Sequence, residues 1–310
     1  MDGAQCNRSL MHCCLGKNPK IFKTPSVCTA NEIIFMMDIS HVLKKIRNNI
    51  IKSGLDKHCT RLLKLPNKFE IHWKMFIDFF EWDQQNSLQL HRKLTNEHIY
   101  PDSQLKMRNY LAEDVLNSTM LNSFKIYKEN LGEKGQILNG VIEFLEHTSQ
   151  LVAIFRDGRP IKEMSDTRLN ELKLVNSWFF EWEENTPQNE KQRNLMSHQC
   201  HEDIHSCILG FLDLCETVLK LQTSSFVTPR LINSDVIENI FNQQRSTYNG
   251  ANSNPNAVQY KQTINSIVLG QTSISKKANA ARAHTALPYP IDVKKPALKK
   301  GLKHHMKEVQ

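Results

Sequence analysis

The chain has 310 residues, a formal net charge of +8 and 40% hydrophobic residues, so it is long enough for one large domain or two ordinary ones. It contains no apolar run of about 18 residues, which argues against a membrane span, and its opening MDGAQCNRSLMHCC lacks the order of a secretory signal. The excess of basic residues suits a polyanionic partner.

The eight cysteines are sparse for a disulfide scaffold, and no two of them form a CxxC pair. This usage is typical of reduced thiols in an intracellular protein.

The first 56 residues predict one strand followed by one helix. The apolar run Ile33–Met37 is typical of a buried strand. Asp38 or Ser40 then begins a helix, and we interpret Asp38 as its cap rather than as a catalytic acid. The predicted buried side holds Val42, Leu43, Ile46, Ile50 and Ile51. A basic side holds Lys44, Lys45, Arg47 and Lys52; it could approach DNA phosphates, although a solvated face is the more common outcome.

Helical periodicity dominates from residue 57 to residue 195. Gly- and Pro-containing stretches separate the predicted helices, which cover Trp73–Trp82, Leu105–Leu131, Ile137–Phe155 and Leu169–Trp182. Several aromatic-rich helices of this length predict a bundle with its own core.

A further amphipathic helix is predicted over Met196–Leu221. His201 and His205 lie four residues apart on it, a spacing that could present two imidazoles to zinc. No HExxH motif or paired-cysteine knuckle accompanies them, so a weakly polar helix face is the favoured interpretation.

The stretch Asn233–Ile264 predicts a helix, a turn and a second helix that starts at Pro255. Asn233 or Ser234 can cap the first helix, and Glu238 has the spacing of a capping box with Asp235. An apolar stripe of Val236, Ile237, Ile240 and Phe241 would hold this helix rigidly. Glu238, which lies off the stripe, could then be a metal ligand, although the local pattern alone favours a capping role.

Residues 271–310 contain nine basic and two acidic residues and few large apolar ones, which predicts a disordered basic tail. Such a tail could contact nucleic acid in a salt-sensitive way, direct nuclear import, or only add solubility.

Three blocks of the chain resemble P-element-type transposases, whose vertebrate relatives carry a THAP zinc finger. The C-terminal signature of that family is matched at Asn233, Asp235, Glu238, Asn239, Phe241, Arg245, Asn254, Pro255 and Gln259, with departures at Ser234, Ile240 and Tyr260. A second block is matched at His41, Lys44, Arg47, Asn48 and Asn49. The opening Asp2–Asn7 resembles the segment that follows a central strand.

The resemblance implies a mainly α chain with an incomplete RNase H-like α/β fold and an all-helical insertion. The implied divisions are a partial RNase H-like segment at 1–56, the insertion at 57–195, the rest of the RNase H-like domain at 196–270, and the disordered tail at 271–310. Lys93–Thr95, His98–Ile99, Lys106–Met107 and Leu111–Ala112 match the insertion.

The resemblance also implies a site. The family uses a triad of acids to hold two divalent metal ions, and Mg²⁺ suits such oxygen ligands. By resemblance Asp2 is the second acid and Glu238 the last, both catalytic and metal-binding. The first acid lies upstream of this chain in the family, and no strand precedes Asp2 to hold it in place. Some members bind GTP in the insertion, but Ser87 stands here where the nucleotide-binding aspartate is expected, so we assign no residues to GTP.

The expected protein is a truncated or domesticated transposase relative in the nucleus, with metal-dependent DNA strand cleavage and transfer as its ancestral activity and none in this chain. DNA and further copies of the chain are the expected partners, and no membrane. The alternative is a non-catalytic DNA- or protein-binding module.

Overall fold

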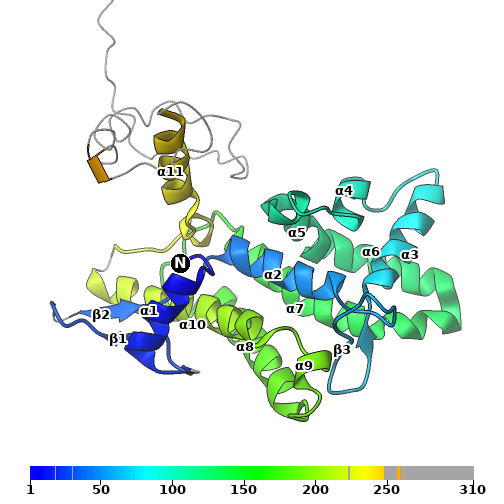
Figure 1. Cartoon of the computed structure of the whole chain (residues 1–310), viewed down its shortest axis with the longest axis horizontal. Coiled ribbons are helices and arrows are strands. Elements are labelled where there is room, and N and C mark those ends of the chain that lie inside the picture. The colour runs from blue at the N-terminus through cyan, green and yellow to red at the C-terminus, as the bar shows by residue number, and fades with distance from the viewer. Residues whose placement is uncertain (18, 30, 223, 248–256, 259–260, 262–310) are drawn as a thin grey trace, which may run out of the picture.

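The computed structural model describes residues 1–17, 19–29, 31–222, 224–247, 257–258 and 261, and it is mainly helical. Figure 1 shows the helices packed side by side along the long axis of the molecule, with α11 (Asp235–Thr247) projecting from them. The predicted helix from Pro255 and the predicted tail lie outside the described residues, apart from isolated positions. Within that part of the chain, no helix is long and apolar enough to cross a membrane.

The chain opens with a helix and a short hairpin. Helix α1 (Gln5–Leu15) is followed by strands β1 (Lys23–Pro25) and β2 (Glu32–Ile34), which pair antiparallel with Thr24 opposite Ile33. The predicted buried strand Ile33–Met37 is therefore wrong in its bounds. The first residues of β2 are exposed, whereas Phe35 and Met37 beyond it are buried.

The buried segment after β2 packs against helix α10 (His198–Leu221) instead of against another strand. The Ser206 hydroxyl donates to the Phe35 carbonyl (3.2 Å). Gly210 allows this approach, because a Cβ atom there would lie only 2.6 Å from the same carbonyl oxygen. The packing fixes the backbone just before helix α2 (Ile39–Ile51).

The first residue pairs with this fixed backbone. The Met1 amino group donates to the Met36 carbonyl (2.7 Å), and the Asp38 amide donates to the Met1 carbonyl (2.8 Å). Met1 thus lies opposite Met37 and bonds the residues on either side of it, which is the hydrogen-bond pattern of a parallel strand pair. The pairing places Asp2 beside the start of α2.

Helix α2 is buried on more than its apolar side. Four of its predicted buried residues are inaccessible, and Ile51 is half-buried. The predicted basic side is wrong for three of its four residues, because Lys44 and Arg47 are also buried and Lys45 is bound to Asp203 of α10. Arg47 donates to the Lys106 carbonyl (2.6 Å), and burial lowers its pKa to about 10. Neighbouring elements therefore cover Lys44 and Arg47, whereas Lys52, just after the helix, is exposed as expected.

The middle of the chain forms a helical bundle. After a small hairpin, β3 (Leu63–Lys64) and β4 (Glu70–Ile71), come α3 (Trp73–Gln85), α4 (Asn96–Ile99), η1 (Leu105–Met107), α5 (Asn109–Leu116), α6 (Ser118–Leu131), η2 (Gly132–Leu138), α7 (Asn139–Phe155), α8 (Thr167–Asn185) and α9 (Lys191–Asn194). The turn η3 (Pro229–Leu231) follows α10. The predictions for α3, α7, α8 and α10 are confirmed to within a few residues at their ends.

The single helix predicted over Leu105–Leu131 is wrong. The segment is a 3₁₀ turn and two helices, α5 and α6, which meet at Asn117. The Asn117 side chain accepts from the Met120 amide (3.0 Å) and caps α6. A side chain that bonds the backbone locally favours a new helix start over a continuous helix.

One hydrophobic core runs through the molecule. It extends from Met11 in α1 to Val227, and it includes residues of α2, α3, α5, α6, α7, α8 and α10. Helix α7 lies at its centre, packed against α5, α6 and α8. The N-terminal segment, the bundle and α10 are therefore held as one packed unit.

Candidate carboxylate site between α2 and α11

Asp38 is the buried centre of the site. Its Oδ1 accepts from the Ser40 and His41 amides (2.8 and 3.2 Å), which caps α2. The predicted capping role is confirmed. Its Oδ2 accepts from the Ser234 amide (2.7 Å) and lies 3.0 Å from the Ser234 hydroxyl. One carboxylate therefore joins the start of α2 to the start of α11.

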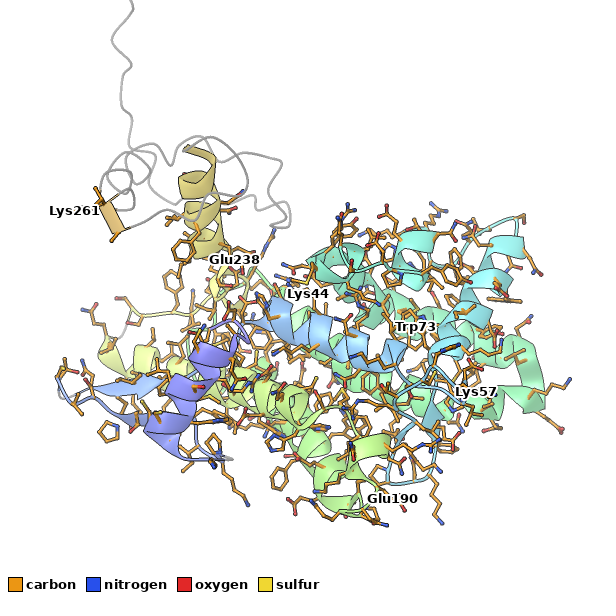
Figure 2. All side chains as sticks on the ribbon, in the orientation of Figure 1. Lys44, Lys57, Trp73, Glu190, Glu238 and Lys261 are labelled. Atoms are coloured by element: carbon orange, nitrogen blue, oxygen red, sulfur yellow. The ribbon has the colours of Figure 1, made fainter. Side chains whose placement is uncertain are left out.

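Glu238 lies next to this junction, one turn into α11. Its Oε1 is 3.1 Å from His41 Nε2 and 3.0 Å from the Ser234 hydroxyl. The hydroxyl has one hydrogen, so it donates either to Glu238 or to Asp38 at any moment. Figure 2 shows Glu238 at the end of α11 that faces α2 and Lys44.

The predicted capping box is not formed. Ser234 directly precedes α11, and Glu238 lies four residues beyond it rather than three. The Glu238 amide donates to the Ser234 carbonyl (2.9 Å), as in an ordinary helical turn. The Glu238 carboxylate is thus free of the capping role and bonds His41 of another helix.

The ionisable groups around Glu238 are strongly coupled. The hydrogen bond from His41 lowers the pKa of Glu238 to about 2; burial opposes this shift, and Ser234 and Lys44 assist it. Burial and the neighbouring Asp38 raise the pKa of Asp235. Burial lowers the pKa of Lys44, against the attraction of Glu238 and Asp38. The site is acidic, and the cations that act on its carboxylates include Lys44 of α2 and Arg156 at the end of α7.

The Asp2 carboxylate is held, contrary to the expectation that nothing would position it. Its Oδ1 accepts from the Ala4 amide (3.1 Å) and from the Asn7 side-chain amide (2.6 Å). The backbone of Met1 is tied to the residues before α2. Asp2 therefore lies on the same side of the molecule as Asp38, but it bonds the first turn of α1.

The carboxylates of this region are not arranged as a metal site. Carboxylate oxygens are the ligands Mg²⁺ prefers. Among the described residues, however, Asp2, Asp38 and Glu238 belong to no group of three potential ligands whose atoms lie within 4.8 Å of one another. Each carboxylate is bonded to protein groups instead. As arranged here the site does not fit a bound divalent ion, and the roles of Asp2 and Glu238 stay predictions.

The apolar stripe of α11 does not hold the helix in place, which corrects another expectation. Val236, Ile237 and Phe241 are exposed by 61%, 55% and 46%. The described attachments of α11 are the polar bonds at its start. Sequence periodicity shows that residues share a helix face, but it does not show what covers that face.

Two residues that make the site were not singled out from the sequence as site residues. His41 was only one of several family matches, and Ser234 was a departure from the family pattern. The signal for Ser234 was its position as a helix cap. His41 carried no local signal, because its partner Glu238 lies 197 residues away in the chain.

Residues 40–167 match the family described as "TNP-like, GTP-binding insertion domain". Among solved structures, the fold is similar to that in the Drosophila P element transposase strand transfer complex, with a TM-score of 0.69 and 17% sequence identity. The match covers 88% of this chain and 60% of the transposase chain.

This chain is similar to the P-element-type transposases in fold, and residues 40–167 match a domain family of transposase-like proteins. The recognition made from the sequence blocks is confirmed. The family match covers α2 to the start of α8, and the predicted divisions at residues 56, 195 and 270 stay predictions.

A second similarity is of a different kind. Over 147 residues the chain is 29% identical to the exonuclease/helicase subunit RexB of Lactococcus lactis subsp. cremoris (strain MG1363). The matched part is 45% of this chain and only 12% of RexB. So short a part of that protein supports no assignment for this chain.

The coupling of Glu238 to His41 predicts an unusual titration. A carboxyl titration followed by ¹³C NMR should give Glu238 a pKa of about 2, below its ordinary 4.5, and His41→Ala should raise it toward the ordinary value. Because the folded-state pKa is depressed, this group contributes stability above about pH 4.5 and loses it as pH falls toward 2. An unchanged Glu238 pKa in the His41 variant would contradict the assigned contact.

Proposed function

We propose that this protein is a DNA-binding relative of P-element-type transposases that does not itself cut DNA. Metal-dependent strand cleavage and transfer is its ancestral chemistry. Two observations together carry the proposal. The fold is similar to that of a transposase over 88% of the chain. The carboxylates of Asp2 and Glu238, however, are bonded to protein groups and do not converge on a common metal position.

The fold is proposed to be an incomplete RNase H-like unit with a helical insertion. The parallel pairing of Met1 with the residues around Met37 supports a remnant of a parallel sheet. Helices α2, α10 and α11 would belong to this unit, and residues 57–195 to the insertion. The small hairpins β1–β2 and β3–β4 are the strands that the described residues form.

Asp2 and Glu238 are proposed as the inherited positions of the second and third acids of the family. In an assembled site such carboxylates hold two divalent ions, which activate the attacking oxygen and stabilise the leaving one. Here Asp38 and Ser234 connect the two ends of the site through hydrogen bonds. These bonds favour a structural role for the carboxylates, which is to hold the start of α2 to the start of α11.

DNA is proposed as the partner on charge and on family relation. The similar solved structure is a strand transfer complex. The net charge is +8, and residues 271–310 contribute nine basic and two acidic residues to it. Neutralising phosphates with such residues releases counterions, so the affinity should fall steeply with salt. A nuclear location follows from the same proposal.

Binding of the full chain to a fluorescent duplex should be measured between 50 and 300 mM salt. We expect the affinity to fall as salt rises. The logarithm of the binding constant should decrease with the logarithm of the salt concentration with a slope of about 0.9 per phosphate contact. Deleting residues 271–310 should weaken binding at least tenfold and flatten the slope. A variant with the tail lysines changed to glutamine is the matched control for chain length. Salt-independent binding, or none at 50 mM, would refute the DNA-binding proposal.

One observation favours a second candidate, a protein-binding module. The exposed stripe of Val236, Ile237 and Phe241 on α11 is of the kind buried in protein contacts. Failure to bind DNA combined with self-association, measured by light scattering and lost in Val236→Ser with Phe241→Ser, would favour this alternative.

A further inference from the structure

A histidine pair on α10 lies inside the protein and shares no residue with the carboxylate site between α2 and α11. His201 is 1% exposed, and neither of its ring nitrogens has a hydrogen-bond partner among the described residues. The rings of Trp182 and Phe179 lie beside it, with centroids 5.6 and 6.3 Å away. The expectation of a weakly polar helix face is therefore wrong for His201.

His205, one turn further along, is oriented by a neighbour. Its Nδ1 lies 2.8 Å from the Asn176 side-chain oxygen of α8, so Nδ1 donates and carries the proton. The lone pair is then on Nε2, which has no hydrogen-bond partner among the described residues and lies 3.9 Å from Glu183 Oε2. A ligating histidine held in one tautomer by its other nitrogen is the usual arrangement around protein-bound metals.

Unpaired nitrogens inside a protein are costly, and each calls for an explanation. Burial lowers the pKa of His201 to about 3 and that of His205 to about 4, so both rings are neutral at physiological pH. Protonation therefore does not supply partners for them. A bound cation would use the free lone pairs and balance the Glu183 carboxylate.

We propose that Glu183, His201 and His205 form a zinc site that joins α8 to α10. One ligand atom from each of the three residues lies within 4.8 Å of the others. Bond lengths of about 2.0–2.2 Å in a tetrahedral site set ligand atoms about 3.4 Å apart, so the three need only a small closure. A water molecule completes the tetrahedron. Two nitrogens and one carboxylate oxygen suit Zn²⁺ better than Mg²⁺.

The site would act on the stability of the bundle. A short connection that contains Pro187 and α9 joins helix α8 to helix α10. Zinc bound near the two ends of this connection stabilises the folded chain by an amount that rises with the logarithm of the zinc concentration over the dissociation constant. This inference is independent of the DNA-binding proposal, since none of its residues belongs to the carboxylate site.

The test uses the full chain stripped of metal with a chelator. In competition with a chromogenic chelator, each protein chain should bind one zinc ion tightly. Zinc should also raise the melting temperature of the protein. Glu183→Gln and His205→Gln should each weaken zinc binding at least tenfold. His198→Gln is the matched control, because His198 lies on the same helix but is exposed. It should leave the affinity unchanged.

His201→Phe separates metal binding from folding. The ring would fit beside Phe179 and Trp182 and would remove both unpaired nitrogens, so this variant should fold without metal and show no rise in melting temperature with zinc. Cobalt should give the wild type an intense visible band typical of four-coordinate sites, absent in His201→Phe. The proposal would be overturned if the wild type bound no zinc ion tightly, or if all four variants bound zinc as tightly as the wild type.

Discussion

Replacing Arg8 with methionine is expected to lower the free energy of unfolding by about 3–5 kcal/mol, because it leaves two buried carboxylates without their cation. Arg8 of α1 is bonded to Glu202 and, at 2.6 Å, to Asp203 of α10. The three side chains are 2–5% exposed. Urea unfolding followed by far-UV circular dichroism measures the change.

The pKa of Arg8 shows how strongly Glu202 and Asp203 stabilise its charge. Burial by itself lowers the pKa of Arg8, but Asp203 and Glu202 more than offset this and raise it. In the wild type Lys45 is also bonded to Asp203, and His12 to Glu202 (2.6 Å), and both contacts should persist after the substitution. Their contacts are less buried, so they replace only part of the lost interaction.

Two controls make the Arg8 result interpretable. Lys74→Met removes an exposed ion pair with Asp78 and should cost less than about 1 kcal/mol. A triple variant, Arg8→Met with Glu202→Gln and Asp203→Asn, removes the stranded charges and should recover much of the loss. If Arg8→Met costs no more than Lys74→Met, the buried network does not hold α1 to α10.

This network also bears on the candidate site. It fixes α1 on α10, and Asp2 is bonded to the first turn of α1. The segment before α2 rests on the same face of α10 through Ser206 and Gly210. Thus α10 is the common support for Asp2 and Asp38.

Local patterns predicted the long helices because the helical spacing of their apolar residues indicates which side of each helix is buried. Helices α3, α7, α8 and α10 each carry an apolar face that one core can cover. The break at Asn117 was missed because the apolar pattern continues across it, although an Asn-Ser pair is a known cap signal. The capping of α2 by Asp38 was predicted correctly, since it depends only on adjacent residues.

The missed features depend on contacts between distant parts of the chain. Nothing local distinguishes Arg47, which is buried in α2, from Lys52, which directly follows that helix and is exposed. The partners of Arg8 lie about 195 residues away. His201 and His205 could be paired from their spacing, but Glu183 could be added only once α8 was packed against α10.

Nicking of DNA is expected to be absent. Strand cleavage by the family's chemistry needs carboxylates grouped around metal ions. In this protein Glu238 is bonded to His41 and Ser234, and Asp2 to Ala4 and Asn7. The wild-type chain should thus be indistinguishable from Glu238→Ala and Asp2→Asn, even under conditions in which it binds DNA.

The most direct test is supercoiled plasmid incubated with the purified full chain and Mg²⁺ or Mn²⁺, with open-circular product quantified over time. The account predicts the same background rate for the wild type, both variants and a sample with chelator. Metal-dependent conversion by the wild type that is lost in Glu238→Ala would contradict it, and would show that these acids still assemble a working metal site.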